Sequence, residues 1–302
     1  MADENAVDCL FERLRLYQPR SPEAAELARG VASRINTRLT SHDKLIRQNT
    51  LDKLWCKQTG AVQILLSILE NSRDNITSSY ITSILRDVLC LKQGKGKKCS
   101  ANNLARQQCC QHFISLNGTQ VMLRALLATH SKRDGNVNTE LMQQDIVWTL
   151  AALAPKDGKF AIKVRMLGCV RTMHLILKGH LTDSKIIFPL LVIMKQLSKN
   201  AVTTSILVRD GIVATYDRLL GSMGFIPTAR LRLCLDAIDY FSKNMIQNGI
   251  YRYMFHSQFR CTQKHLQASF TVTVLRKILE SMKIMMIKQL LLFQSALMLM
   301  RL

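Results

Sequence analysis

The sequence of 302 residues carries 42 Lys and Arg against 21 Asp and Glu, a formal net charge of +21, and 48% of its residues are hydrophobic. This apolar content is sufficient for a packed interior, whereas five prolines and 6% aromatic residues argue against a β-sandwich and favour an all-α protein. The nine cysteines form no C-x-x-C pair and are odd in number, which argues against a disulfide framework and indicates reduced thiols in a cytosolic protein.

The first segment, residues 1–20, is predicted to be an N-terminal helix followed by a linker. Ala6–Tyr17 has amphipathic helical spacing, and the first twelve residues contain four acids and no long apolar run. They resemble neither a secretory signal nor a transit peptide, so we expect a cytoplasmic location. The next helix begins at Ser21-Pro22-Glu23, where serine caps the helix and proline fits its first turn, and it runs to about Leu39.

A series of further helices is predicted between polar or glycine-containing turns. They cover His42–Lys57, Thr77–Leu91, Leu104–Leu116, Thr139–Leu153, Thr182–Asn200, Ala201–Asp210 and Pro227–Asn244. The sequence of Ala154–Gly158 is typical of a turn. Two polar insertions, Lys92–Asn103 and Ser131–Asn138, are expected at the surface between helices.

Four glycines precede the same apolar pattern, and they are Gly60, Gly118, Gly168 and Gly211. The residues five, eight and nine positions after each glycine are apolar and share one helix face. The residue four positions before each glycine is also apolar, so a buried helix is expected there. A glycine in the left-handed conformation can end one helix and turn the chain into the next. Spacings of 58, 50 and 43 residues fit armadillo or HEAT units with insertions in the first two, which predicts an armadillo/HEAT-like helical solenoid over residues 21–249.

Four segments of this region resemble the N-terminal armadillo-like region of the cytosolic carboxypeptidases, the tubulin deglutamylases also called ATP/GTP-binding-protein-like proteins. The segments are TGAVQILLSILEN (59–71), LNGTQVMLRALL (116–127), APKDGKFAIKVRMLG (154–168) and NAVTTSILVRDGIVATYDRLLG (200–221). The resemblance extends over roughly Ser21–Asn248. Its most particular part is PKDGKF at Pro155–Phe160, since a general armadillo repeat does not require this stretch.

The resemblance implies a helical region that precedes a linker, a β-rich domain and a zinc metallocarboxypeptidase domain. That last domain removes glutamates from polyglutamate side chains and acidic C-termini. Its chemistry needs an H-x-x-E pair, a distant histidine and a later glutamate. Of the seven histidines, only His180 has an acid three residues later, Asp183, and we interpret this pair as the charged end of one helix and the cap of the next.

No catalytic residue, metal ligand or cofactor-binding residue is therefore assigned, and zinc is expected only in a catalytic domain that this sequence lacks. The chain is predicted to be inactive alone. If its parent is a carboxypeptidase, the chain is a truncated isoform, a fragment or an incomplete gene model.

Positive charge is concentrated in the second half, where 22 basic and 7 acidic residues lie from Ala151 onward. Together with the resemblance, this charge predicts acidic protein partners such as polyglutamylated tubulin tails. A contact patch is predicted beside the turn, at Lys156, Lys159, Lys163 and Arg165. The alternative is that these residues only solvate an outer helix face.

Nucleic acid is disfavoured as a partner. Tyr251–Phe255 is the one cluster that combines aromatic rings with a basic residue as base stacking requires, and burial of these rings in a terminal helix is the favoured interpretation. Gly94–Lys98 is not a phosphate-binding loop, because Leu91 replaces its first glycine and Lys98 its metal-binding hydroxyl. We predict a flexible basic insertion there.

Residues 250–302 are predicted to be a divergent C-terminal helical tail, in which the repeat pattern fades. Ile284–Leu302 is almost continuously apolar, but Lys288, Gln289 and Gln294 interrupt it. These interruptions disfavour a membrane anchor and favour an amphipathic helix at the end of the solenoid or a non-native terminus. An alternative exon or a mistranslated intron would produce such a terminus.

Two functions stay open at this point. The preferred one is a non-catalytic scaffold that positions an acidic substrate for the catalytic domain of a cytosolic zinc carboxypeptidase. The other is an independent armadillo-type adaptor that binds an acidic peptide or a partner helix in a concave groove.

Overall fold

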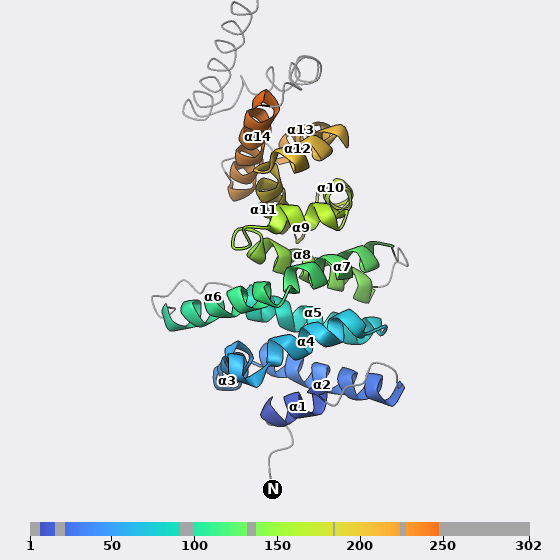
Figure 1. Cartoon of the computed structure of the whole chain (residues 1–302), viewed down its shortest axis with the longest axis vertical. Coiled ribbons are helices and arrows are strands. Elements are labelled where there is room, and N and C mark those ends of the chain that lie inside the picture. Colours follow the sequence, from blue (N-terminus) through green and yellow to red (C-terminus); the bar gives the residue numbers. More distant parts are fainter. Residues whose placement is uncertain are drawn as a thin grey trace, which may run out of the picture.

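The computed structural model describes residues 7–15, 22–90, 100–131, 137–183, 185–223 and 228–247. Within these ranges the chain forms fourteen α-helices and one short 3-10 helix, and no strand. The predicted all-α solenoid is therefore confirmed. Figure 1 shows the helices stacked along the longest axis of the molecule, from α1 (Val7–Arg15) at one end to α14 (Ala229–Gln247) at the other.

The first of three rows of helices runs through the whole stack. It contains α2 (Pro22–Thr40), α5 (Asn75–Leu89), α8 (Val137–Leu153), α11 (Ile187–Ser198) and α14. Each helix of this first row packs against the next one. Apolar faces are thus buried between neighbouring layers, as in other repeat proteins, and no single central core is needed.

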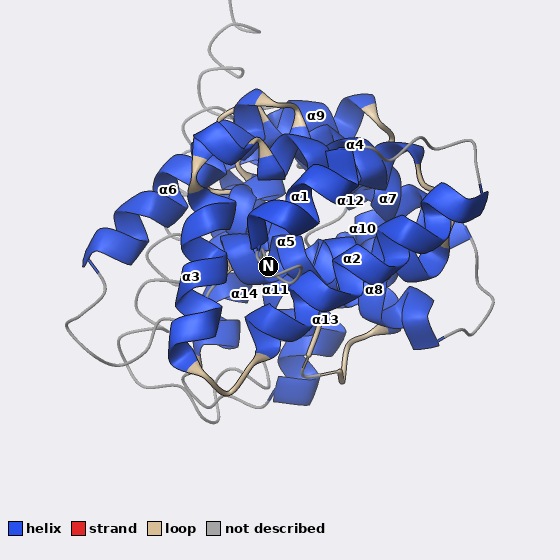
Figure 2. Ribbon diagram, turned by 90° about the horizontal axis from the view of Figure 1, so that it is seen from below, coloured by secondary structure: helices blue, strands red, loops and turns tan. Residues whose placement is uncertain are grey.

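The second and third rows complete each layer. The second row contains α3 (Lys44–Trp55), α6 (Ser100–Ser115), α9 (Phe160–Met166) and α12 (Ala201–Arg209). The third row contains α4 (Ala61–Asn71), α7 (Gly118–Ser131), α10 (Cys169–Gly179) and α13 (Ile212–Met223), and η1 (Lys57–Thr59) lies between α3 and α4. Figure 2 looks along the stack and shows α6 projecting from its side.

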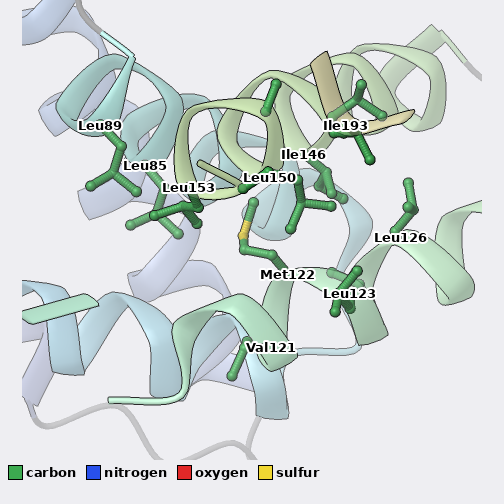
Figure 3. Close-up of a cluster of buried hydrophobic side chains, with 14 of the residues drawn as sticks. Leu85, Leu89, Val121, Met122, Leu123, Leu126, Ile146, Leu150, Leu153 and Ile193 are labelled. Atoms are coloured by element: carbon green, nitrogen blue, oxygen red, sulfur yellow. The ribbon is translucent and has the colours of Figure 1, made fainter. Parts of the chain in front are cut away.

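Aliphatic side chains from the first and third rows pack together in the middle of the stack. Figure 3 shows Leu85 and Leu89 of α5, Met122 and Leu126 of α7, Leu150 of α8 and Ile193 of α11 in one cluster. All of these side chains are 1% exposed or less. Because full burial of such a side chain stabilises a fold by about 1.5–3 kcal/mol, contacts between adjacent layers supply most of the stability of each layer.

Three of the four predicted glycine corners have the expected backbone. Gly60, Gly168 and Gly211 take positive φ values of 63°, 70° and 83° and stand directly before α4, α10 and α13. A residue with a Cβ is strained in this left-handed region, so glycine is the natural residue at these positions. The predicted role of these glycines as corners between the second and third rows is confirmed.

The prediction is wrong at Gly118, which is the first residue of α7. Asn117 takes the left-handed conformation instead, with φ 58°, because asparagine tolerates this region better than other residues with a Cβ. Glycine is needed at position 118 for another reason, since a Cβ there would lie 2.4 Å from the buried ring of Phe113. The apolar register shifts by one residue, and Ala125 and Leu126 are buried while Leu127 is only half-buried.

A helix with buried residues precedes each of the corners, but the expected residue is not always the buried one. Cys56, four residues before Gly60, is exposed and ends α3, and η1 carries the chain from there to the corner. At the other corners Phe113, Val164 and Leu207 are buried in the preceding second-row helix. Leu51, Leu54 and Trp55 of α3 are nevertheless buried, so a buried helix does precede Gly60. The expected burial of the residue four positions before the glycine is wrong at Cys56, and Ile114 before Gly118 is only partly buried.

The predicted insertion Lys92–Asn103 is too long at its C-terminal end. Helix α6 already begins at Ser100. Asn102 and Gln48 of α3 exchange amide hydrogen bonds of 3.1 and 3.4 Å, which gives the first turn of α6 a partner in the preceding layer. A polar composition was therefore misinterpreted as a loop.

Several predictions fall on residues outside the described ranges. These are the serine cap at residue 21, most of the two insertions, the aromatic cluster at 251–255, and the apolar segment 284–302. The domain boundaries after residues 20 and 249 stay predictions. Within the described ranges, every helix is too short or too polar to cross a lipid bilayer.

Candidate functional site

The predicted contact patch surrounds the connection between α8 and α9. The backbone amides of Lys156 and Asp157 donate to the carbonyl oxygen of Leu153 at 2.8 and 2.9 Å, and the amide of Phe160 donates to the carbonyl oxygen of Asp157 at 2.9 Å. These bonds end α8 and start α9 with a compact turn. The turn predicted at Ala154–Gly158 is confirmed.

Asp157 is the central residue of this turn. Its carboxylate accepts hydrogen bonds from Lys163 Nζ at 2.7 Å, from Thr119 Oγ1 at 2.9 Å and from the backbone amide of Lys159 at 3.0 Å. The side chains of Asp157 and Lys163 are only 3% and 12% exposed. Because Thr119 lies in the first turn of α7, the buried ion pair joins the third row to the α8–α9 turn.

The four patch residues have different surroundings. Lys163 points its ammonium group at Asp157 in the interior, whereas the ammonium group of Lys156 lies 3.1 Å from the sulfur of buried Cys110. Lys159 is exposed at the start of α9, and Arg165 is half-buried on the same helix. Lys156 and Lys159 are therefore the cations most open to a partner, and Lys163 holds the turn.

Two apolar residues of α9 face solvent beside these cations. Ile162 is 41% exposed and Met166 is 78% exposed, one helical turn apart. Phe160 and Val164 form the opposite, buried face of the same helix. This exposed pair was not predicted from the sequence. The four-residue spacing of Ile162 and Met166, on the face opposite Phe160 and Val164, is the signal that could have identified the pair.

The first row carries a second group of side chains, at the seam between α5 and α8, that sequence reasoning missed. Arg86 of α5 pairs with Asp87 and with Asp145 of α8. Burial raises the pKa of Asp145 to about 6, against the opposing effect of Arg86, while the two carboxylates outweigh burial and raise the pKa of Arg86. Both carboxylates thus share one arginine at the edge of the seam between α5 and α8.

One turn further along α8, Trp148 is partly exposed on the same side. Its indole nitrogen donates to the carbonyl oxygen of Lys185 at 3.0 Å, and its ring lies 6.1 Å from the ring of Phe188 on α11. The two rings join neighbouring layers and leave an aromatic surface open. The run IVWTLAAL gave no sign of this exposure, because it is apolar on every face.

A zinc site of the kind implied by the family resemblance does not fit the described residues. Within them, His, Cys, Asp and Glu side chains do not gather in any group of three or more that could hold a metal ion. His180 Nδ1 lies 3.5 Å from Asp183 Oδ2 at the end of α10, and Asp183 also accepts from the amide of Lys185. His180 does end α10, as expected, but the prediction that Asp183 caps the next helix is wrong, because α11 begins after Ile186 and has no side-chain cap.

The buried histidine and cysteines serve packing. Burial lowers the pKa of His174, whose Nε2 lies 2.8 Å from Thr215 Oγ1 across the seam between α10 and α13. Burial raises the pKa values of the Cys109 and Cys234 thiols to about 12. These thiols therefore stay protonated and pack as small apolar side chains.

The stacked three-helix layers and left-handed corners define a helical repeat protein of the armadillo type. The structure is similar to a designed armadillo repeat protein in complex with peptide (KR)4, with a TM-score of 0.51 and 13% sequence identity over 87% of this chain and 97% of that chain. At this identity the similarity concerns the fold alone.

The chain belongs to the family described as CCP1-like, N-terminal TPR repeats, whose model matches residues 6–248. It is similar to cytosolic carboxypeptidase 1 of Danio rerio, with 29% identity over 198 residues, and of Homo sapiens, with 27% identity over 223 residues. These matches cover 66% and 74% of this chain but only 16% of each relative. The family resemblance expected from the sequence is confirmed.

Proposed function

We propose that this chain is the non-catalytic N-terminal scaffold of a cytosolic carboxypeptidase and positions an acidic substrate, such as a polyglutamylated tubulin tail. The observation that carries this proposal is the family match over residues 6–248, in a chain that spans 16% of the relatives' length. Deglutamylation itself takes place in a zinc-containing catalytic domain elsewhere in such a protein. The protein works in the cytoplasm, in accord with the names of its relatives.

The charge of the chain supports an acidic substrate. A net charge of +21 attracts anionic chains. The attraction extends over about one Debye length, which is about 8–10 Å near physiological salt. Lys156 and Lys159 are exposed beside the α8–α9 turn, and Arg165 lies on α9. In this proposal these three residues contact the substrate, while Lys163 fixes the turn through Asp157.

The scaffold proposal requires that binding depend on the added glutamates. The test is a titration of the full chain with polyglutamylated and unmodified tubulin-tail peptides at two salt concentrations, with affinity measured by fluorescence anisotropy. We expect tighter binding of the polyglutamylated peptide and a difference that shrinks with salt. Equal affinity for both peptides at low salt would remove the substrate-positioning role.

A second candidate function is that of an independent adaptor for a peptide or a partner helix. The observation that favours it is the open aromatic surface of Trp148 and Phe188, since partly exposed tryptophan is a common anchor in protein interfaces. Mapping the transcript past Leu302 separates the two candidates. A continuation into an H-x-x-E domain supports the scaffold, and a stop without one supports the adaptor.

A further inference from the structure

We propose that an extended, carboxylate-rich peptide segment docks across three neighbouring layers on a surface formed by Lys156, Lys159, Lys199 and Lys243. This lysine surface begins at the α8–α9 turn and ends on α14. The inference rests on the proposed function and deepens it, because it names the residues that hold the acidic chain.

Two hydrogen bonds show that the parts of this surface are neighbours. Gln196 Nε2 of α11 donates to the carbonyl oxygen of Ala154 at 3.1 Å, so the end of α11 lies against the beginning of the turn that carries Lys156. Asn244 Nδ2 of α14 donates to the carbonyl oxygen of Ser198 at 2.6 Å, next to Lys199. The ends of α8, α11 and α14 therefore lie at one edge of the stack.

Two lysines surround one aromatic ring at the α14 end. The ammonium groups of Lys199 and Lys243 lie 5.6 and 5.9 Å from the centre of the Tyr240 ring. Cations within about 6 Å of an aromatic ring are held by its quadrupole, which fixes the two charges near each other. Lys243 also donates to Asp239 at 2.6 Å, so Lys199 is the ammonium group at this ring that remains available to a carboxylate of a partner.

The described acids of these elements pair with only one of the four lysines of the surface, Lys243. Asp157 is buried against Lys163, Asp236 pairs with Lys195 at 2.6 Å, and Asp239 pairs with Lys243 at 2.6 Å. Within the described part of the chain, Lys156, Lys159 and Lys199 have no carboxylate partner. A positive excess therefore remains along the edge, and an acidic partner complements it.

The geometry favours an extended peptide over a nucleic acid. Neighbouring helices pack about 8–10 Å apart, so the three layers extend over about 20 Å, which about six extended residues can span. The ring of Tyr240 is occupied by lysines, which leaves little free face for base stacking.

The test uses the full chain and two double variants with the same charge change. Lys156→Glu/Lys199→Glu reverses two charges of the lysine surface. Lys57→Glu/Lys178→Glu reverses two exposed lysines elsewhere, one in η1 and one in the last turn of α10. The probe is a fluorescein-labelled decaglutamate peptide, measured by anisotropy at low and physiological salt. Circular dichroism and melting curves check that each variant folds.

We expect the surface variant to bind the probe at least tenfold more weakly than the wild type at low salt, and the control variant to lose no more than about threefold. Equal losses in both variants would overturn the inference while leaving the proposed function intact, because binding would then follow net charge alone. Absence of binding by the wild type would overturn both. Displacement of the probe by single-stranded DNA, added so that its phosphate concentration equals the carboxylate concentration of the probe, would assign the surface to nucleic acid instead.

Discussion

Replacement of Asp157 by asparagine is expected to be the most destabilising of the charge changes in this molecule. The side chain keeps its size, but its single oxygen can accept either from the amide of Lys159 or from Thr119, which donate to different oxygens of the carboxylate. The ammonium group of Lys163 loses its counter-charge, although its side chain is only 12% exposed. Removal of one partner of a buried ion pair costs about 3–5 kcal/mol. With a denaturant slope of about 3 kcal/mol/M, the urea midpoint should fall by more than about 1 M.

The ion pair is isolated by a double-mutant cycle. Lys163→Met alone leaves a buried carboxylate, whereas Asp157→Asn/Lys163→Met removes both charges. The loss of unfolding free energy in the double variant should therefore be smaller than the sum of the two single losses by about 2 kcal/mol. Lys243→Met is the matched control, since the Lys243–Asp239 pair is 62% and 42% exposed and is worth less than about 1 kcal/mol. The importance of burial for this ion pair would be refuted by additive losses of unfolding free energy in the cycle. It would also be refuted if Lys243→Met destabilised the protein as much as Asp157→Asn.

Three further changes test the local structure by urea unfolding. Gly118→Ala should cost at least about 1 kcal/mol because its Cβ would overlap Phe113, and Phe113→Leu in the same chain should recover part of the loss. Gly30→Ala, inside α2 with no atom within 4 Å of the added Cβ, should instead gain about 0.5–1 kcal/mol. Asp74→Ala should cost about 1 kcal/mol at neutral pH through loss of the α5 cap. Although burial opposes it, hydrogen bonds from Thr77 and Arg29 lower the pKa of Asp74, so its contribution is present above the ordinary value of 3.8 and is lost as the pH falls through the lower folded-state value. The unfolding free energies of the wild type and of Asp74→Ala should therefore converge at acid pH, and a difference that does not change with pH would contradict this.

Helical periodicity predicted the repeat architecture because it records which residues face the neighbouring layer. The pattern after Gly60, Gly168 and Gly211 identified the third row, and the structure places a left-handed corner at each of these glycines. At the remaining corner the pattern shifted by one residue, because asparagine and glycine stand side by side at 117 and 118 and both favour turns. The φ of 58° shows that Asn117 forms the corner, and the close approach of Phe113 explains why residue 118 is glycine.

The candidate site was harder to predict, because charge does not reveal pairing. Lys163 and Lys159 look equivalent in the sequence, yet one ammonium group is buried against Asp157 and the other side chain is exposed. The PKDGKF stretch includes the buried carboxylate of this ion pair, so Asp157 has a structural role in this chain. The partners Thr119 and Lys163 lie 38 and 6 residues from Asp157 and could not be paired with it from spacing alone.

The repeat unit of this chain contains three helices, although the description of its family speaks of TPR repeats. A TPR unit is a helix pair of about 34 residues, while armadillo and HEAT units have about 40–47. The left-handed corners at 60, 117, 168 and 211 are further apart than a TPR unit allows. The short second-row helices, such as α9, account for the additional length.

The first row also determines how the molecule would respond to mechanical force. Because α1 and α14 lie at opposite ends of the stack, tension applied between them acts on every seam in series (Figure 1). Each seam then bears the full load, and the weakest one sets the rupture force of the whole. Stepwise lengthening, layer by layer, is the expected signature, so the scaffold would act as an extensible spacer between whatever is attached at its two ends.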